Sequence, residues 1–281
     1  MALFMNDTKV KSVYWNDVKA QKVYFNDVLV LSGEFAFTYT GACTVEGDLG
    51  GNFVIRFKTS GTLTITDAGN AASLDVFLVG GGGGGAYGCS TMDGNAGGAG
   101  GYTKTQKQIA VAPGSYQILI GAGAAGNNYY QNISTKGGDT SAFGVSAAGG
   151  NSKLPNTKPG HGVDGGSGSG AVNSPGGSNG GNGGKYNSFV GGNGQGTTTR
   201  EFGEPSGKLY AGGGGGGSSN KGVTIPGGAG GGGNGVYYNE TSTMNGQANT
   251  GGGGGGRSVN KSTNEYGGSG GSGIVCIRNH R

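Results

Sequence analysis

The chain has 281 residues, of which 72 are glycine, and its formal net charge is +4. Charged residues make up only 12% of the sequence and the basic ones are scattered, which does not favour a nucleic-acid-binding protein. So little charge also argues against a soluble disordered tail. No stretch approaches the roughly 20 apolar residues of a membrane span, and the N-terminus lacks the pattern of a signal peptide.

Residues 1–32 contain a ten-residue repeat in which an aromatic residue or methionine precedes an Asn-Asp pair. The residues before the three pairs are Met5, Trp15 and Phe25. Asn and Asp tolerate left-handed conformations, so each pair predicts a tight turn, and the flanking valines predict strands. We expect a small module of β-hairpins. Its aromatic side chains pack either on a partner or sister chain, or as a meander on the main domain.

Residues 33–150 alternate apolar and polar residues in short runs, which is typical of an all-β sandwich. The predicted strands are residues 34–40, 52–58, 62–66, 74–79, 108–112, 115–120 and 140–146. Pro113-Gly114 is the predicted turn between the fifth and sixth of these. A last apolar strand, 273–278, should close the sheet that the chain leaves near Gly150. The sandwich would thus comprise residues 33–150 plus 271–281.

Glycine dominates residues 80–101 and 150–270, with runs of six glycines at 80–85, 212–217 and 251–256. Such runs are either slack linkers or polyproline II helices packed side by side, which make no internal hydrogen bonds and are free to bond to neighbours. The equal lengths favour packing, because each run would span about 19 Å and linkers have no reason to repeat their length. We expect a polyproline II bundle inserted in the sandwich.

Residues suited to catalysis or metal binding are sparse. The two histidines, His161 and His280, and the odd set of cysteines, Cys43, Cys89 and Cys276, have no metal-site spacing and form no disulfide framework. We expect free thiols in a protein assembled in a reducing cytoplasm. Glu201 and Glu204 could form a glycosidase pair, but solvated loop charges are the preferred interpretation. The sequence predicts no enzyme, no cofactor and no metal.

Aromatic residues with neighbouring Asn, Ser and Thr lie between the glycine runs, and we expect them in loops at the bundle ends. Aromatic faces beside amides and hydroxyls suit sugar rings and protein surfaces, and loops on a rigid scaffold commonly carry binding. Alternatively, these side chains fold back and plug the rims of the bundle. The contact candidates are Tyr129, Tyr130, Tyr186, Phe189, Tyr237 and Tyr238, and Phe202, Tyr210 and Tyr266 lie in the same class of segment.

A series of motifs across about residues 60–278 resembles the glycine-rich domain of tailed-bacteriophage tail and fibre proteins. The motifs are LDVFLVGGGGGGA at 74–86, GGAGGY at 97–102, VAPGSYQILIGAG at 111–123, GGDTSAFG at 137–144, AAGG at 147–150 and GIVCIR at 273–278. A similar arrangement, a TNF-like β sandwich interrupted by packed polyproline II helices, occurs in anaplastic lymphoma kinase-type receptors. The resemblance therefore implies a jelly-roll or TNF-like sandwich with the bundle inserted in it.

The resemblance also implies a virion component. The expected role is a tail-tip or fibre protein that binds a host surface glycan or outer-membrane protein non-covalently, with no nucleic acid and no membrane insertion. The N-terminal repeats look like short repeats of phage virion proteins, so Tyr14, Trp15, Tyr24 and Phe25 are the virion-anchoring candidates. A homotrimer is expected by analogy with fibres. The alternatives are a capsid or tail decoration protein, and an ice-binding or secreted polyglycine protein.

Overall fold

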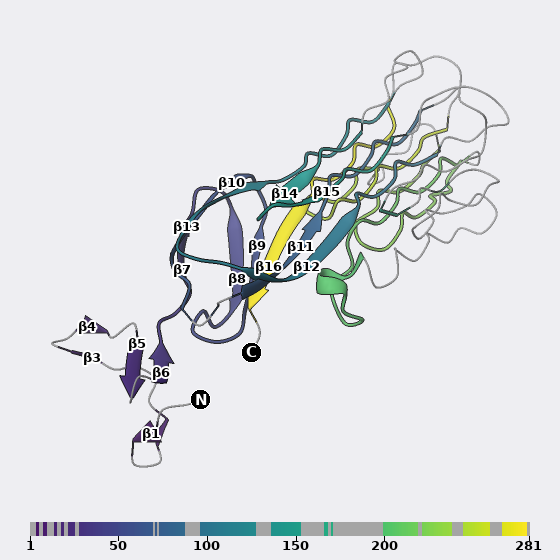
Figure 1. The fold of residues 1–281 in the computed structure, drawn as a ribbon. Helices are drawn as coiled ribbons and strands as arrows, with labels where there is room; N and C mark the ends of the chain where they lie inside the picture. The colour runs from purple at the N-terminus through teal and green to yellow at the C-terminus, as the bar shows by residue number, and fades with distance from the viewer. Residues whose placement is uncertain are drawn as a thin grey trace.

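Two five-stranded antiparallel sheets form the central part of the molecule (Figure 1). The computed structural model describes residues 4–5, 8–9, 14–15, 18–19, 22–25, 28–69, 71, 73–87, 96–127, 136–152, 166–167, 170, 199–218, 221–237, 244–258 and 266–279. The first sheet has the order β15-β14-β13-β10-β7 and the second β12-β11-β16-β9-β8. These sheets confirm the expected all-β sandwich.

The strand bounds agree with most of the predicted ranges, but the predicted strand 108–112 is the end of a longer strand that begins at Thr103, because its first residues are polar and give no apolar signal. The first sheet comprises β7 (Ala36–Tyr39), β10 (Gly61–Asp67), β13 (Gly114–Leu119), β14 (Thr140–Ala142) and β15 (Val145–Ala147). The second comprises β8 (Cys43–Gly47), β9 (Phe53–Phe57), β11 (Ser73–Val79), β12 (Thr103–Ala110) and β16 (Ile274–Asn279). The core lies between the sheets, and alternate residues of β9 and β10 point into it.

Strand β11 is buried on both faces. Val76 and Leu78 face the core between the sheets, whereas Phe77 and Val79 join a second apolar cluster on the outer side. A strand covered on both faces reads as a continuous apolar run rather than an alternation. This explains the sequence LDVFLV and makes β11 a central strand.

Strand β16 lies between β11 and β9, with Phe77 opposite Cys276 and Ile55 opposite Ile277. The chain near Gly150 instead follows β15, at the edge of the other sheet. The expectation that the last strand closes the sheet left near Gly150 is therefore wrong. The physical reason is that β16 is apolar on both faces, like β11, and needs a central position rather than an edge.

Two further predictions about turns need correction. The predicted strand 140–146 is a hairpin, because Phe143 (φ 51°) and Gly144 (φ 74°) are both left-handed and form a two-residue turn between β14 and β15. Pro113 does precede β13, but β12 and β13 belong to different sheets, so the segment at Pro113-Gly114 crosses between the sheets. Strand β8 was not predicted, because four of its five residues are exposed.

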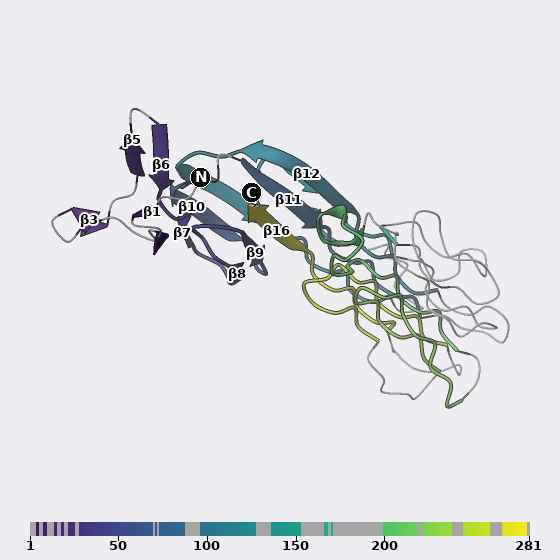
Figure 2. The same cartoon turned by 90° about the horizontal axis from the view of Figure 1, so that it is seen from below.

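Three short hairpins precede the sandwich. They pair β1 (Phe4–Met5) with β2 (Thr8–Lys9), β3 (Tyr14–Trp15) with β4 (Val18–Lys19), and β5 (Lys22–Phe25) with β6 (Val28–Ser32). Each pairing closes around one Asn-Asp pair, as in Met5 opposite Thr8. The hairpins lie at the end of the molecule opposite the glycine-rich segments (Figures 1 and 2). The side chains of residues 1–32 lie outside the described part.

The glycine-rich segments run side by side from the sandwich (Figure 2). Backbone N–H groups of Gly80, Gly83 and Ala86 donate to carbonyls of segment 96–102 over 2.8–3.0 Å, whereas those of Gly82 and Gly85 donate to segment 268–271. Residues three apart thus face the same neighbour, which is the repeat of a polyproline II helix. These bonds support packing over the slack-linker alternative for the described segments.

The run 80–85 is enclosed by segments 96–102, 121–127, 136–138, 148–152, 251–256 and 267–271. A Cβ atom built on Gly82 would overlap the carbonyl of Gly252, and one on Gly83 the carbonyl of Asn151. The backbones are therefore closer than any side chain permits. Glycine is required at these positions by close approach rather than by unusual dihedral angles.

Candidate functional site

The glycine helices end together at the end of the bundle away from the sandwich, which we call the distal rim (residues 87, 127, 218, 237 and 257). Backbone bonds there join Asn127 to Gly85 at 2.9 Å and Arg257 to Ala86 at 3.0 Å, so the helix ends are in register. The described part of the chain stops at or next to each of these five residues. Several segments outside the described part therefore start at this rim.

Of the six predicted contact residues, the described part of the chain includes only Tyr237. Tyr237 is half-buried and follows Val236, which forms a parallel β-bridge with Arg257. The other five, Tyr129, Tyr130, Tyr186, Phe189 and Tyr238, lie outside the described residues. At the rim itself Tyr87 is buried, with 2% of its surface exposed, whereas Tyr266 is 45% exposed.

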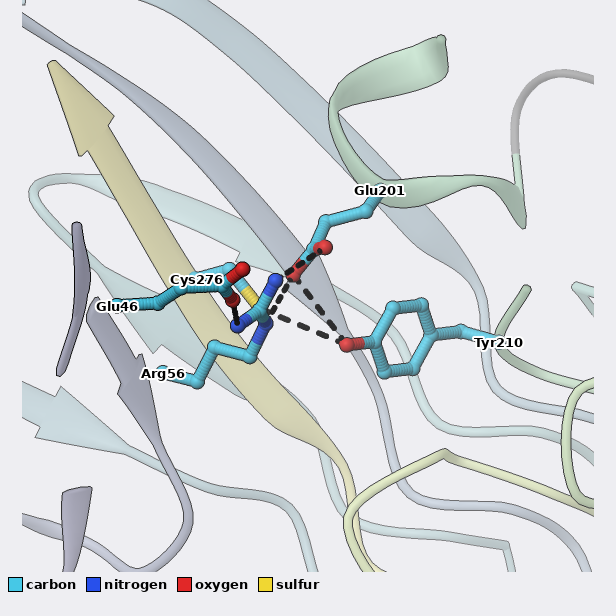
Figure 3. Close-up of polar contacts among 5 residues, drawn as sticks. All are labelled: Glu46, Arg56, Glu201, Tyr210 and Cys276. Atoms are coloured by element: carbon cyan, nitrogen blue, oxygen red, sulfur yellow. Dashed lines mark hydrogen bonds and ion pairs between the residues drawn. The ribbon is translucent and has the colours of Figure 1, made fainter. Parts of the chain in front are cut away.

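Segment 199–211, which we call the strap, lies against the outer face of the second sheet. It contains the short 3₁₀ turn η2 (Glu201–Gly203). Glu201 accepts two hydrogen bonds from Arg56 of β9, at 2.6 Å to Nε and 2.8 Å to Nη2 (Figure 3). Arg56 also donates to Glu46 of β8 at 2.6 Å. The Glu201 side chain is 8% exposed, so the Arg56–Glu201 pair is largely withdrawn from water.

A second arginine holds the same strap. Arg278 of β16 pairs with Glu204 at 2.6 Å and with Asp75 of β11 at 3.1 Å. Its guanidinium carbon lies 4.3 Å from the centre of the Phe202 ring, within the range of a cation–π contact. The strap is therefore attached to the sheet by two ion pairs and an aromatic contact.

Apolar side chains fill the space beneath these ion pairs. The cluster consists of Phe77, Val79, Phe202, Tyr210, Ala211, Ile274 and Cys276. The ring of Tyr210 lies 5.4 Å from that of Phe77, and its hydroxyl donates to Glu201 at 3.3 Å. Ala211 leads directly into the run 212–217, so the strap joins the outer face of the sandwich to a glycine helix.

The strap corrects several expectations from the sequence. Glu201 is a buried ion-pair partner rather than a solvated loop charge, and Phe202 and Tyr210 are buried against β11 rather than placed in loops at the bundle ends. Glu201 and Glu204 pair with different arginines, so they do not face each other as an acid and nucleophile would. The sequence signal for this site was a single arginine, Arg56 or Arg278, in each of two otherwise apolar strands.

The surroundings of Glu201, Tyr210 and Cys276 keep each of these side chains in one protonation state. For Glu201, burial raises the pKa, but the hydrogen bonds from Arg56, Cys276 and Tyr210 outweigh it, so the pKa is below its usual value. Burial raises the pKa of the Tyr210 hydroxyl and of the Cys276 thiol well above their usual values. Glu201 is therefore charged at neutral pH, whereas Tyr210 and Cys276 stay protonated. Such a network fixes structure and offers no activated nucleophile.

The described residues contain no group of three or more His, Cys, Asp or Glu side chains that could hold a metal ion. Cys43 and Cys276 are free thiols, as expected, and Cys89 lies outside the described residues. Among the residues with a described structure, no helix has the length and apolar character needed to cross a membrane.

Comparison with known proteins identifies one family. A family model described as a glycine-rich domain matches residues 58–280, which include the strands from β10 to β16 and all of the glycine runs. A search of curated proteins found no match.

Proposed function

We propose that this chain, which belongs to the glycine-rich domain family, is a structural protein of a tailed-bacteriophage virion. It would sit at the tail tip or a fibre end and bind the host cell surface non-covalently, without catalysis. The carrying observation is the hydrogen-bonded glycine bundle, of which several described segments end at one rim. Loops held by a rigid scaffold are a common basis for recognition, and the connecting segments here start from such a scaffold.

The separation of the two ends supports a division of roles. The N-terminal hairpins lie at one end of the molecule and the distal rim at the other (Figure 1). Residues 1–32, with Tyr14, Trp15, Tyr24 and Phe25, would attach the protein to the virion. The predicted contact residues, Tyr129, Tyr130, Tyr186, Phe189, Tyr237 and Tyr238, would contact a surface glycan or an outer-membrane protein.

Deleting residues 1–32 tests the attachment role. Particles assembled in the presence of the truncated chain should not incorporate it, while the purified truncated protein should still bind host cells. A truncated chain that is incorporated normally would contradict the anchoring role of the hairpins.

Substitutions at the predicted contact residues test the recognition role. Tyr129→Ala combined with Tyr130→Ala, and separately Tyr237→Ala, should lower binding of the purified protein to host cells. Val45→Ala in β8, on an exposed edge strand of the sandwich, is the control and should leave binding unchanged. Normal binding and host range in these tyrosine variants would favour the second candidate, a decoration protein of the capsid or tail. The hydrogen-bonded and largely buried glycine bundle favours that candidate, because a stiff body is enough for a decoration role.

A further inference from the structure

The outer faces of the two sheets differ in charge. The second sheet carries Arg56, Asp75 and Arg278, and the strap pairs with both arginines through Glu201 and Glu204. On the first sheet, Leu63, Ile65 and Ile118 point into the core, so the alternate residues point outward. The central outward residues are Thr38, Thr62, Thr64, Ser115, Gln117 and Leu119, which we call the hydroxyl face.

The hydroxyl face is uncharged and exposed. Ser115 and Gln117 are exposed, Thr62 and Thr64 are half-buried, and Leu119 is 53% exposed, more than Val45 or Tyr266. No outward position of β7, β13, β14, β15 or of β10 before its bulge carries a charge. None carries an aromatic ring either, which argues against a platform for stacking sugars.

Cross-strand hydrogen bonds hold these side chains in place. Gln117 donates to Thr62 at 3.0 Å, and the hydroxyls of Thr64 and Ser115 lie 3.3 Å apart. The register aligns Thr64 with Thr38 on the other side of β10. The result is a regular array rather than a set of freely rotating side chains.

We propose that the hydroxyl face is an interaction surface for a second copy of this chain, related by a two-fold axis. Hydroxyl and amide groups both donate and accept hydrogen bonds, so the face is complementary to itself. Two identical charged faces would repel each other, whereas these faces meet without like charges. A two-fold contact uses the same patch on both subunits, and the exposed Leu119, at the end of β13, would add an apolar contact at its margin.

The size of the face sets the strength of the contact. Three strands about 4.8 Å apart and about six residues of 3.3 Å cover roughly 15 Å by 20 Å. This is smaller than the about 800 Å² per partner of a standard stable interface. The pairing is therefore weak and dependent on concentration, and it would act where many copies are held close together.

Sedimentation of the full chain from about 1 µM to about 1 mM tests the proposal. The chain should pass from monomer to dimer over this range, and Gln117→Lys should raise the dissociation constant about tenfold or more, because it places like charges against each other. Gln106→Lys is the matched control, since Gln106 is an exposed glutamine on β12 of the other sheet. Leu119→Ser, which introduces no charge, should weaken pairing several-fold.

The outcomes separate clearly. A dimer weakened by Gln117→Lys and Leu119→Ser but unaffected by Gln106→Lys supports the hydroxyl face. A monomer throughout the range, a trimer, or a dimer that responds equally to Gln117→Lys and Gln106→Lys overturns the proposal. Host-cell binding plays no part in this measurement, so its result is independent of the proposed function.

Discussion

Successive glycine residues in the run 80–85 face different neighbouring backbones, and residues three apart face the same one, because three residues complete one turn. A Cβ on Gly81 would overlap the carbonyl of Ala122, and three residues on, a Cβ on Gly84 would overlap that of Ala125. Ordering a residue costs about 1–2 kcal/mol. One net hydrogen bond of about 1 kcal/mol and a Cα–H···O contact of about 0.5–1 kcal/mol offset most of this cost.

Replacing Gly82 by alanine should lower the free energy of unfolding by about 3 kcal/mol, because the added methyl overlaps the backbone of Gly252. Guanidinium unfolding of the purified chain measures this change. Gly50→Ala is the control, since the nearest atom to its Cβ is the flexible Glu34 side chain at 3.3 Å, and it should stay within about 0.5 kcal/mol of the parent. Equal stability of the two variants would contradict close packing of the run.

Glu201 gives the molecule a pH dependence with a definite sign. Its pKa in the folded chain lies below the usual value of 4.5, so the unfolded chain binds the proton more readily. The stability from this group is therefore present above about pH 4.5 and is lost as the pH falls through the folded-state value. Unfolding midpoints measured from pH 6 downward (about pH 3 at the lowest) should fall less steeply for Glu201→Gln than for the parent. Parallel curves would refute the assignment.

Two ion pairs on one element, the strap, differ in burial. Glu201 is 8% exposed as a side chain and Glu204 is 45% exposed. Removing one partner of a buried pair costs about 3–5 kcal/mol, whereas an exposed pair contributes about 0–1 kcal/mol. Glu201→Gln should therefore destabilise the chain much more than Glu204→Gln. Hydrogen exchange of residues 199–211 should rise in the first variant, and a larger rise in the second would contradict this account.

Most strands could be predicted from the sequence, because the alternation of apolar and polar residues and the apolar runs indicate which residues are buried. The burial of β9 (Phe53–Phe57) alternates strictly along the strand, and β11 is a continuous apolar run since both of its faces are covered. Strand β8 was missed because an edge strand with exposed Thr44 and Val45 lacks that signal. The two-residue turn at Phe143-Gly144 was hidden because phenylalanine rarely takes a left-handed conformation.

The strap could not be predicted, since its partners lie 145 residues apart in the sequence, as for Arg56 and Glu201. Local composition marks Glu201 as a loop residue, and only the topology of β9 and β16 brings two arginines beneath it. The recognition residues stay a prediction, because most of them fall outside the described segments. The bundle could be predicted because close approach of the backbones requires glycine, and runs of glycine are visible in the sequence.

For the whole molecule, the sandwich and the bundle are continuous. Strand β11 leads directly into the run 80–85, and segment 267–273 leads into β16, so adjacent central strands extend into adjacent glycine helices. Tethering at both ends reduces the entropy lost when the bundle orders. This continuity gives the distal rim a fixed position relative to the sheets, on which the proposed recognition role depends.

Hydrogen exchange of the glycine amides tests the packed bundle most directly. The N–H groups of Gly83, Gly215 and Gly254 donate to neighbouring backbones at 2.8–2.9 Å. We predict that these amides exchange at least about a thousandfold more slowly than in an unstructured peptide, because exchange requires the bundle to open. Exchange at the rate of a free peptide in these runs would contradict the account.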